Sequence, residues 1–380
     1  MKKIFLFKCA ILLMSVLVSN ALSQSRIEIH PDVNKIPFWS SDHITIDTKQ
    51  NLVGNPVSNT FGKILREIGS VNQKGLNVIL GGKWALSAAS INDRRIVLLD
   101  KDNLTLIDYD LVSHRSFVLA QSGRGPGDLF FPKEVVVDGN NLFIPMGGSS
   151  VTQYDCSQSP CVFEKTIPLD KINYQSVDVT NNQLVGLVSA PGIAPTSNQN
   201  SNAAPLVISS LNGKVTNQFG RNYDFGNRWM LMDTFKRGFV RHVEKLNVSV
   251  VAFESYPIIY VYDDNYQLNK TYKITDFVLG KYQYNTSTQA ITIPDSDFSM
   301  ITGLSVLDRE NLVVEVLQRK ISNNSGNKIL HDVFQYYIIN IENNKNYYLG
   351  ELNNTDSRIY LLSHGALLYS NEEYYFYKYE

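Results

Sequence analysis

The sequence predicts an all-β fold, a six-bladed β-propeller, on the strength of three observations. Hydrophobic runs of strand length recur six times along the 380 residues, and each precedes a second strand of branched or aromatic residues. Pairs of Asn, Asp and Gly lie where hairpins between such strands need turns. No long stretch keeps a helical period, so we expect little α-helix.

The expected strands pair in chain order. The six hydrophobic runs are residues 96–99, 142–144, 184–188, 248–253, 312–316 and 366–369. The strands that follow them are residues 104–109, 151–154, 206–209, 258–262, 334–341 and 374–379. A loop followed by short antiparallel strands and tight turns is the unit of a propeller blade, and the spacing of the runs predicts one blade for each.

The last blade is short of strands, because the chain ends soon after its second run. Residues 61–68 form an amphipathic run early in the chain with no hairpin partner nearby. We expect this run to join the last blade as a strand beside residues 372–379. The ring would then be closed by an N-terminal strand, and the open edges of the sheet would disappear.

The first 21 residues have the pattern of a secretory signal peptide. Lys2 and Lys3 precede an apolar run at 9–18, and Ser19 and Ala21 are small residues at a cleavage site. The alternative is a membrane anchor, but the apolar run is shorter than the roughly 20 residues that span a bilayer. We therefore expect a signal peptide at 1–21, an N-terminal extension at 22–60 and the propeller at 61–380.

Two cysteines remain after the signal peptide, Cys156 and Cys161. Cysteines this close across a turn, in an exported protein, predict a local disulfide with Cα atoms about 4.4–6.8 Å apart. The alternative is a zinc site, which needs further Cys or His ligands nearby, and the sequence places none there.

The glycine-rich segment before the second predicted blade resembles NHL-type repeats. Its pattern is Gly-x-Gly-Pro-Gly, an aromatic residue, Pro and Val-x-Val-Asp, formed by Gly123, Gly125, Pro126, Gly127, Phe130 or Phe131, Pro132, Val135, Val137 and Asp138. The segment 122–128 looks more closely like the signature of six-bladed propeller proteins exported by Bacteroidetes. The resemblance implies a propeller fold and export, and it implies no particular activity.

The candidate ligand site is a group of basic and aromatic residues after the third predicted blade. Exposed aromatic rings beside arginines suit sugar stacking or carboxylate recognition. The alternative for the tryptophan is a structural role, filling a gap between blades. The candidate ligand-binding residues are Trp229, Arg228, Arg221, Arg237 and Arg241. Arg124 of the glycine-rich loop is a further candidate, which could contact an anion together with the loop amides. The alternative is that the glycines of this loop only allow a turn between blades and that Arg124 is a structural residue.

Other functional classes have weaker support. The formal net charge of −1 argues against nucleic acid as a partner. No Gly-x-Ser-x-Gly motif marks a serine hydrolase, and six histidines are scattered along the chain. A three-histidine metal site stays an alternative, because a propeller can gather distant residues at one mouth. We expect no metal and no cofactor.

We therefore expect a periplasmic or extracellular monomer without a membrane span. Its function would be that of a binding or interaction module for a protein, peptide or glycan, rather than that of an enzyme. The alternative function is that of a metal-dependent lyase or hydrolase that uses the central channel.

Overall fold

The structure is a computed structural model. It describes residues 26–48, 55–68, 75–76, 78, 80–82, 84, 86–169, 172–188, 204–223, 235–285, 290–292, 296–324, 327–353 and 356–379. The predicted signal peptide at 1–21 lies outside these described residues.

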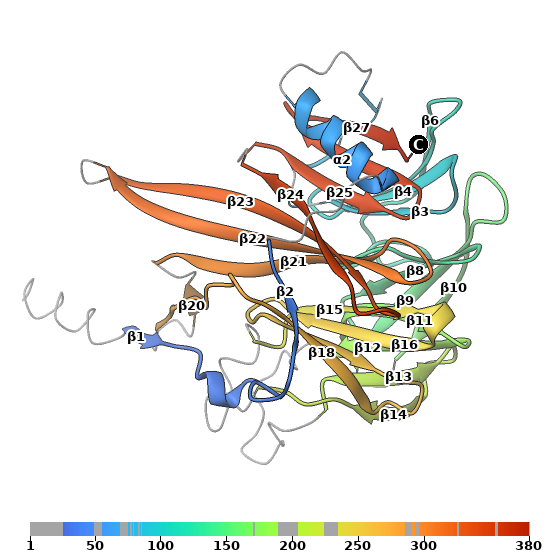
Figure 1. The fold of residues 1–380 in the computed structure, drawn as a ribbon. Coiled ribbons are helices and arrows are strands. Elements are labelled where there is room, and N and C mark those ends of the chain that lie inside the picture. Colours follow the sequence, from blue (N-terminus) through green and yellow to red (C-terminus); the bar gives the residue numbers. More distant parts are fainter. Residues whose placement is uncertain are drawn as a thin grey trace, which may run out of the picture.

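Within the described residues, six antiparallel sheets follow one another along the chain (Figure 1). The strands of the first three are β3 (Leu86–Ser90), β4 (Arg95–Asp100), β5 (Thr105–Asp110) and β6 (Arg115–Ala120); β7 (Val136–Asp138), β8 (Asn141–Met146), β9 (Ser150–Asp155) and β10 (Val162–Pro168); and β11 (Tyr174–Thr180), β12 (Gln183–Val188), β13 (Leu206–Ser210) and β14 (Val215–Phe219). Those of the last three are β15 (Gly238–Val243), β16 (Val248–Phe253), β17 (Ile258–Tyr262) and β18 (Leu268–Ile274); β21 (Phe298–Val306), β22 (Asn311–Asn324), β23 (Asn327–Asn340) and β24 (Asn346–Leu352); and β25 (Arg358–Leu362), β26 (Gly365–Ser370) and β27 (Glu373–Lys378).

The predicted strands are confirmed, and they take the same positions in all six sheets. Each of the six hydrophobic runs lies in the second strand of its sheet, and each following run overlaps the third. The second strands are apolar because both of their faces are covered: all residues of β4 and β16 are buried. The hydrophobic clusters combine residues of consecutive sheets, so the core lies between neighbouring sheets.

The first strands of the sheets contact one another in chain order. β3 contacts β7, and the series continues through β11, β15, β21 and β25, which contacts β3 again. Sheets stacked face to face in this way, with their first strands innermost, form a propeller-like all-β fold. The residues at the two ends of the first strands therefore gather at two opposite places.

The strand expected at residues 61–68 is wrong. These residues belong to helix α2 (Pro56–Glu67), apart from Ile68 at its C-cap. Asn55 caps the helix by accepting a hydrogen bond from the backbone N–H of Val57, and Pro56 takes the first helical position. The buried residues Val57, Phe61 and Ile64 recur at helical spacing, which places them on one face. The run is amphipathic with the helical period, not with the strand period of two.

The helix still lies against the last sheet. α2 contacts β24, β26 and β27, and Figure 1 places it beside the red C-terminal strands. Among the described strands β27 pairs with β26 alone, and the backbone N–H of Leu76 donates to the carbonyl of Tyr374 over 2.7 Å. Within the described residues, helix α2 and Leu76 thus lie against the last sheet.

The segment before α2 also packs against the sheets. β1 (Arg26–Ile29) forms a small sheet with β19 (Tyr282–Asn285) and β20 (Ala290–Thr292), and β2 (Ile44–Ile46) adds a parallel strand to β18. Single turns of 3-10 helix occur at Val33–Lys35 and Glu244–Leu246. The boundary expected between residues 60 and 61 falls inside α2.

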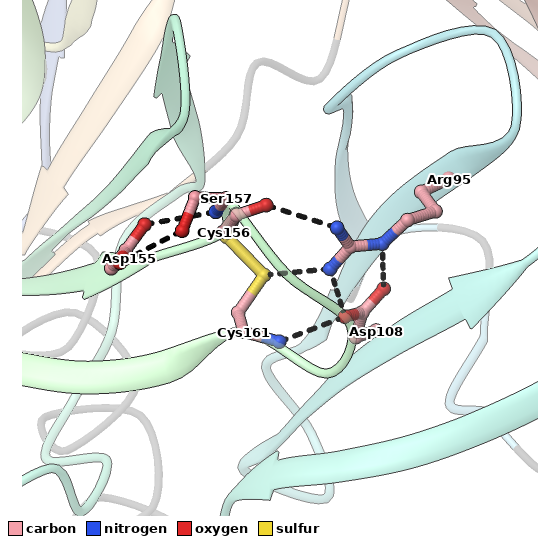
Figure 2. Close-up of a disulfide and its surroundings, with 6 residues drawn as sticks. All are labelled: Arg95, Asp108, Asp155, Cys156, Ser157 and Cys161. Atoms are coloured by element: carbon pink, nitrogen blue, oxygen red, sulfur yellow. Dashed lines mark hydrogen bonds and ion pairs between the residues drawn. A yellow bond between two sulfur atoms is a disulfide. The ribbon is translucent and has the colours of Figure 1, made fainter.

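Cys156 and Cys161 form a disulfide with Cα atoms 4.1 Å apart, slightly closer than the predicted range. Figure 2 shows that this loop of the second sheet is held by an ion pair of the first. Arg95 of β4 pairs with Asp108 of β5 over 2.5 Å and donates to the carbonyl of Cys156 over 3.0 Å. Asp108 in turn accepts the backbone N–H of Cys161 over 3.0 Å. The disulfide loop therefore connects two sheets as well as closing its own hairpin.

Candidate functional site

Two cavities lie at the two ends of the first strands. The one at their starts, here called the basic mouth, has a volume of about 730 Å³ and is lined by residues of all six sheets, among them Trp84, Lys101, Arg237, Glu254 and Arg358. The one at their ends, the opposite mouth, has a volume of about 990 Å³ and is lined among others by Asp138, Asp178, His242, Asp308 and His364. Both exceed the size at which a pocket can hold a small ligand.

Strand pairing explains why distant residues meet at the basic mouth. Leu86, at the start of β3, pairs with Asp100 at the end of β4, so Lys101 lies at the same end as the start of the first strand. In the fourth sheet Arg237 precedes β15 and Glu254 follows β16, and their backbones are joined by a hydrogen bond of 2.9 Å. The first and fourth sheets thus deliver residues at the start of the first strand and just after the second strand to this cavity.

Three arginines of the basic mouth are held by carboxylates. Arg358 pairs with Glu315 over 2.6 Å, and both side chains are almost fully buried. Arg241 pairs with Glu134 over 2.7 Å, and Glu134 also accepts the Ser176 hydroxyl over 2.6 Å. The third pair, Arg319 with Asp332, has two hydrogen bonds of 2.6 and 2.7 Å. These arginines join neighbouring strands or sheets and form the wall of the cavity.

Three other cations line this cavity, Lys101, Lys133 and Arg237. Within the described residues, the side chains of Lys101 and Arg237 form no hydrogen bond and no ion pair with a carboxylate. Burial, and then the charge of Arg358, lower the pKa of Lys101. Glu254 faces both cations from a position where burial raises its pKa to about 7, although Arg237 and Lys101 counteract this rise. Near neutral pH Lys101 and Arg237 therefore lie opposite Glu254, whose carboxyl group is partly protonated.

An aromatic side chain completes the wall. Trp84, just before β3, is 44% exposed and lines the cavity. Its ring lies 5.0 Å from the guanidinium of Arg358 and 5.5 Å from the ring of Phe334. A half-exposed indole beside a cation offers a flat apolar surface next to positive charge.

The opposite mouth has a different character. Asp178 accepts the backbone N–H of His242 over 2.7 Å, and burial raises the pKa of its carboxyl to about 6. The Nε2 atom of His242 lies 3.0 Å from the Thr180 hydroxyl, and burial lowers the pKa of its imidazole to about 4. Burial and then Glu244 raise the pKa of Asp138. Carboxyl, imidazole and amide groups dominate this end.

The structure separates the basic residues that the sequence placed in one cluster. Arg237 and Arg241 line the basic mouth, Arg237 facing the cavity and Arg241 paired with Glu134. Arg221 instead lies over the ring of Phe38, 4.9 Å from its centroid, and lines neither cavity. Trp229 and Arg228 lie outside the described residues.

Arg124 lines neither cavity and lies 5.0 Å from the ring centre of Phe130. Within its glycine-rich loop, Asp128 accepts the backbone N–H of Gly125 over 2.8 Å. A Cβ at Gly123 would come within 2.1 Å of the Asp128 carboxylate, and Gly127 adopts a φ of +82°. The local contacts of these glycines are thus those of a tight turn between the first and second sheets.

No group of three or more His, Cys, Asp or Glu side chains within the described residues could hold a metal ion. Of the histidines, His242 and His364 line the opposite mouth and the others line neither cavity. The described residues thus contain no set of metal ligands for the alternative function, that of a metal-dependent lyase or hydrolase.

Trp84, Lys101 and Glu254 were missed by the sequence analysis. Lys101 and Glu254 each directly follow the second strand of their sheet, and both line the basic mouth. A search for charged residues at these recurring positions could have found them.

No family model matches the chain. Among solved structures, it is similar to a member of the DUF4221 family from Bacteroides vulgatus, with 10% identity, a TM-score of 0.51 and coverage of 82% of this chain and 97% of that chain. A putative exported protein from Bacteroides fragilis aligns with 12% identity and a TM-score of 0.49, over 81% of this chain and 80% of that chain. At these identities the similarity concerns the fold alone.

A curated relative matches a shorter stretch. The chain is 26% identical over 105 residues to the ATPase subunit HslU of an ATP-dependent protease from Lactobacillus helveticus. The match covers 28% of this chain and spans about a fifth (21%) of the length of that relative, too little to place the chain in its family. A separate observation concerns membranes: none of the helices in the described ranges combines the length and the apolar character needed to cross one.

Proposed function

We propose that this chain is an exported six-bladed β-propeller, and that it acts as a monomeric binding module for an anionic ligand held in the basic mouth. The propeller with six blades is supported by six consecutive sheets and by the contact of β25 with β3. Closure of the last blade would be provided by α2 and the stretch around Leu76, which lie against its strands. The proposed NHL-like kinship rests on the glycine-rich motif alone.

Export is supported by the signal-peptide pattern at 1–21 and by the disulfide between Cys156 and Cys161. Disulfides persist in oxidising compartments such as the bacterial periplasm. The proposed division of the chain is a signal peptide at 1–21, an N-terminal extension and the propeller.

The observation that supports anion binding most directly is the state of Lys101 and Arg237. Both line the same cavity, and in the described part of the chain neither forms an ion pair with a carboxylate. Burial keeps the neighbouring Glu254 partly protonated near pH 7, and Glu134 and Asp102 also influence Lys101. The three arginines of this wall are neutralised by Glu315, Glu134 and Asp332, and Lys133 adds a further cation. A ligand carboxylate would supply the missing counter-charge, and a partly buried site strengthens such a pair.

Calorimetric titration of the folded protein with citrate, digalacturonate and a short acidic peptide tests this function. We expect at least one of these anions to bind with a Kd below about 1 mM, and Arg237→Gln and Lys101→Gln each to weaken it about tenfold. Arg221→Gln, which removes a cation outside both cavities, is the matched control and should bind like the wild type. Absence of binding by every anion, or equal binding by Arg237→Gln, would contradict the proposal.

A further inference from the structure

The lining of the basic mouth contains three kinds of recognition group, which belong to or adjoin the first, third, fourth and fifth sheets. The first is the cation pair of Lys101 and Arg237. The second is the half-exposed indole of Trp84, over whose ring the guanidinium of Arg358 lies at 5.0 Å. The third is a set of hydrogen-bonding side chains on the first strands: Ser87, Gln175 and Ser176 near the strand starts, Thr302 in the middle of β21, and Ser305 near its end, where it also lines the opposite mouth.

Some of these polar side chains form hydrogen bonds within the wall, and others line the cavity without such a bond in the described part of the chain. The Ser176 hydroxyl donates to Glu134 over 2.6 Å, and the Thr302 hydroxyl donates to Glu315 over 2.6 Å. In the described part of the chain, the side chains of Gln175 and Ser305 form no hydrogen bond, and both are only partly exposed. Half-buried amide and hydroxyl groups of this kind suit a ligand that brings its own hydroxyl groups.

We infer that the ligand of the basic mouth is an acidic saccharide of the uronic acid type. This inference rests on the proposed function. The carboxylate of such a sugar would lie between Lys101 and Arg237, and its apolar C–H face would stack on Trp84. Its ring hydroxyls would meet Gln175. A cavity of about 730 Å³ has room for a disaccharide.

A peptide carboxylate would use the two cations equally well. A peptide carboxylate has no sugar ring to stack on Trp84 and no ring hydroxyls for the amide and hydroxyl side chains. An acidic sugar can contact the cations, Trp84 and these polar side chains. A neutral sugar would use Trp84 and the polar side chains but would leave the two cations without a counter-charge. The combination therefore favours the acidic sugar over both.

The test compares four probes by calorimetry: digalacturonate, a disaccharide containing glucuronate, neutral galactobiose and a short peptide with a free carboxylate. We expect one of the two uronates to bind at least about tenfold more tightly than galactobiose and the peptide. Trp84→Ala should weaken this uronate about tenfold, and Trp84→Phe should restore part of the affinity. Thermal unfolding of each variant establishes that it is folded.

The outcomes separate this inference from the function on which it rests. Binding of the peptide but of neither uronate would overturn the saccharide assignment and leave anion binding standing. Equal binding of galactobiose and the uronates would overturn the acidic assignment. Uronate binding that is unchanged in Trp84→Ala would overturn the stacking geometry. Failure of every anion to bind would contradict the proposed function as well.

Discussion

The two mouths of the cavity system lie at opposite ends of the same six strands and differ in charge. At the basic mouth the cationic side chains outnumber the carboxylates, and Trp84 adds an aromatic face. At the opposite mouth the carboxylates of Asp138, Asp178, Glu244 and Asp308 lie among Lys245, Arg309 and two histidines. The fold forms a cavity at both ends of the first strands. The proposed preference of the basic mouth for an anion therefore comes from the residues near the strand starts and not from the architecture.

The basic mouth itself contains two classes of cation. Arg358, Arg241 and Arg319 are neutralised by carboxylates and support the wall. Lys101, Lys133 and Arg237 line the cavity, and within the described residues none of them forms an ion pair with a carboxylate; Glu254 lies near Lys101 and Arg237. Removal of a cation should therefore affect folding in the first class and ligand binding in the second.

The largest effect is expected at Arg358. Arg358→Met leaves the buried Glu315 without its partner and should lower the free energy of unfolding by about 3–5 kcal/mol. Arg237→Met removes an exposed cation and should change it by less than about 1 kcal/mol. Urea unfolding of the two variants measures both values. Equal losses of unfolding free energy in the two variants would contradict the distinction between cations that support the wall and cations that bind the ligand.

The next effect is expected at the opposite mouth, where burial lowers the pKa of His242 to about 4. A folded pKa below the unfolded value of about 6.5 means that the neutral imidazole stabilises the fold above pH 6.5. This stability is lost as the pH falls from 6.5 towards 4. Asp178 acts in the opposite direction, because its raised folded pKa of about 6 favours the folded state as the pH falls.

A variant isolates the histidine from this opposing contribution. The cost of His242→Gln, measured by urea unfolding, should be smaller at pH 5 than at pH 7.5 by about 1–2 kcal/mol. The carboxyl of Asp178 accepts a backbone N–H of residue 242, so its own titration is retained in the variant. A cost that does not depend on pH would show that His242 is not held neutral by burial.

A smaller effect is expected on the affinity of the basic mouth. Below pH 7 Glu254 is mostly neutral, and above pH 7 it adds a negative charge opposite Lys101 and Arg237. The affinity for digalacturonate should therefore fall roughly threefold to tenfold from pH 6 to pH 8 at constant ionic strength. Glu254→Gln should make the affinity nearly independent of pH in calorimetric titrations. The same decrease in the variant would assign the titration to another group.

The sequence predicted the second and third strands of each sheet because burial on both faces makes them apolar, as in β4 and β16. The first strands were harder to find. β3 reads LSAAS and borders the cavities, so its small and polar residues carry no hydrophobic pattern. The candidate site lies at the ends of those strands, which is why most of it could not be predicted.

Two predictions from the sequence were wrong, the grouping of Arg221 with the site and the strand at residues 61–68. Arg237 and Arg241 were predicted as site residues from composition, but Arg221 was grouped with them because sequence distance cannot show which end of a strand faces which mouth. Residues 61–68 were assigned to a strand because the run is amphipathic and the last blade lacked a strand, although its apolar residues follow the helical period. The cap at Asn55 and the proline after it were the signals for α2.

The most direct measurement of the central claim is the fluorescence of Trp84 as the only tryptophan. In a variant with Trp39→Phe and Trp229→Phe, titration with digalacturonate should give a saturable change in Trp84 emission at the Kd found by calorimetry. Arg237→Gln in the same background should shift that titration about tenfold to higher concentration. Calorimetric binding with unchanged Trp84 emission would place the ligand elsewhere and contradict the account.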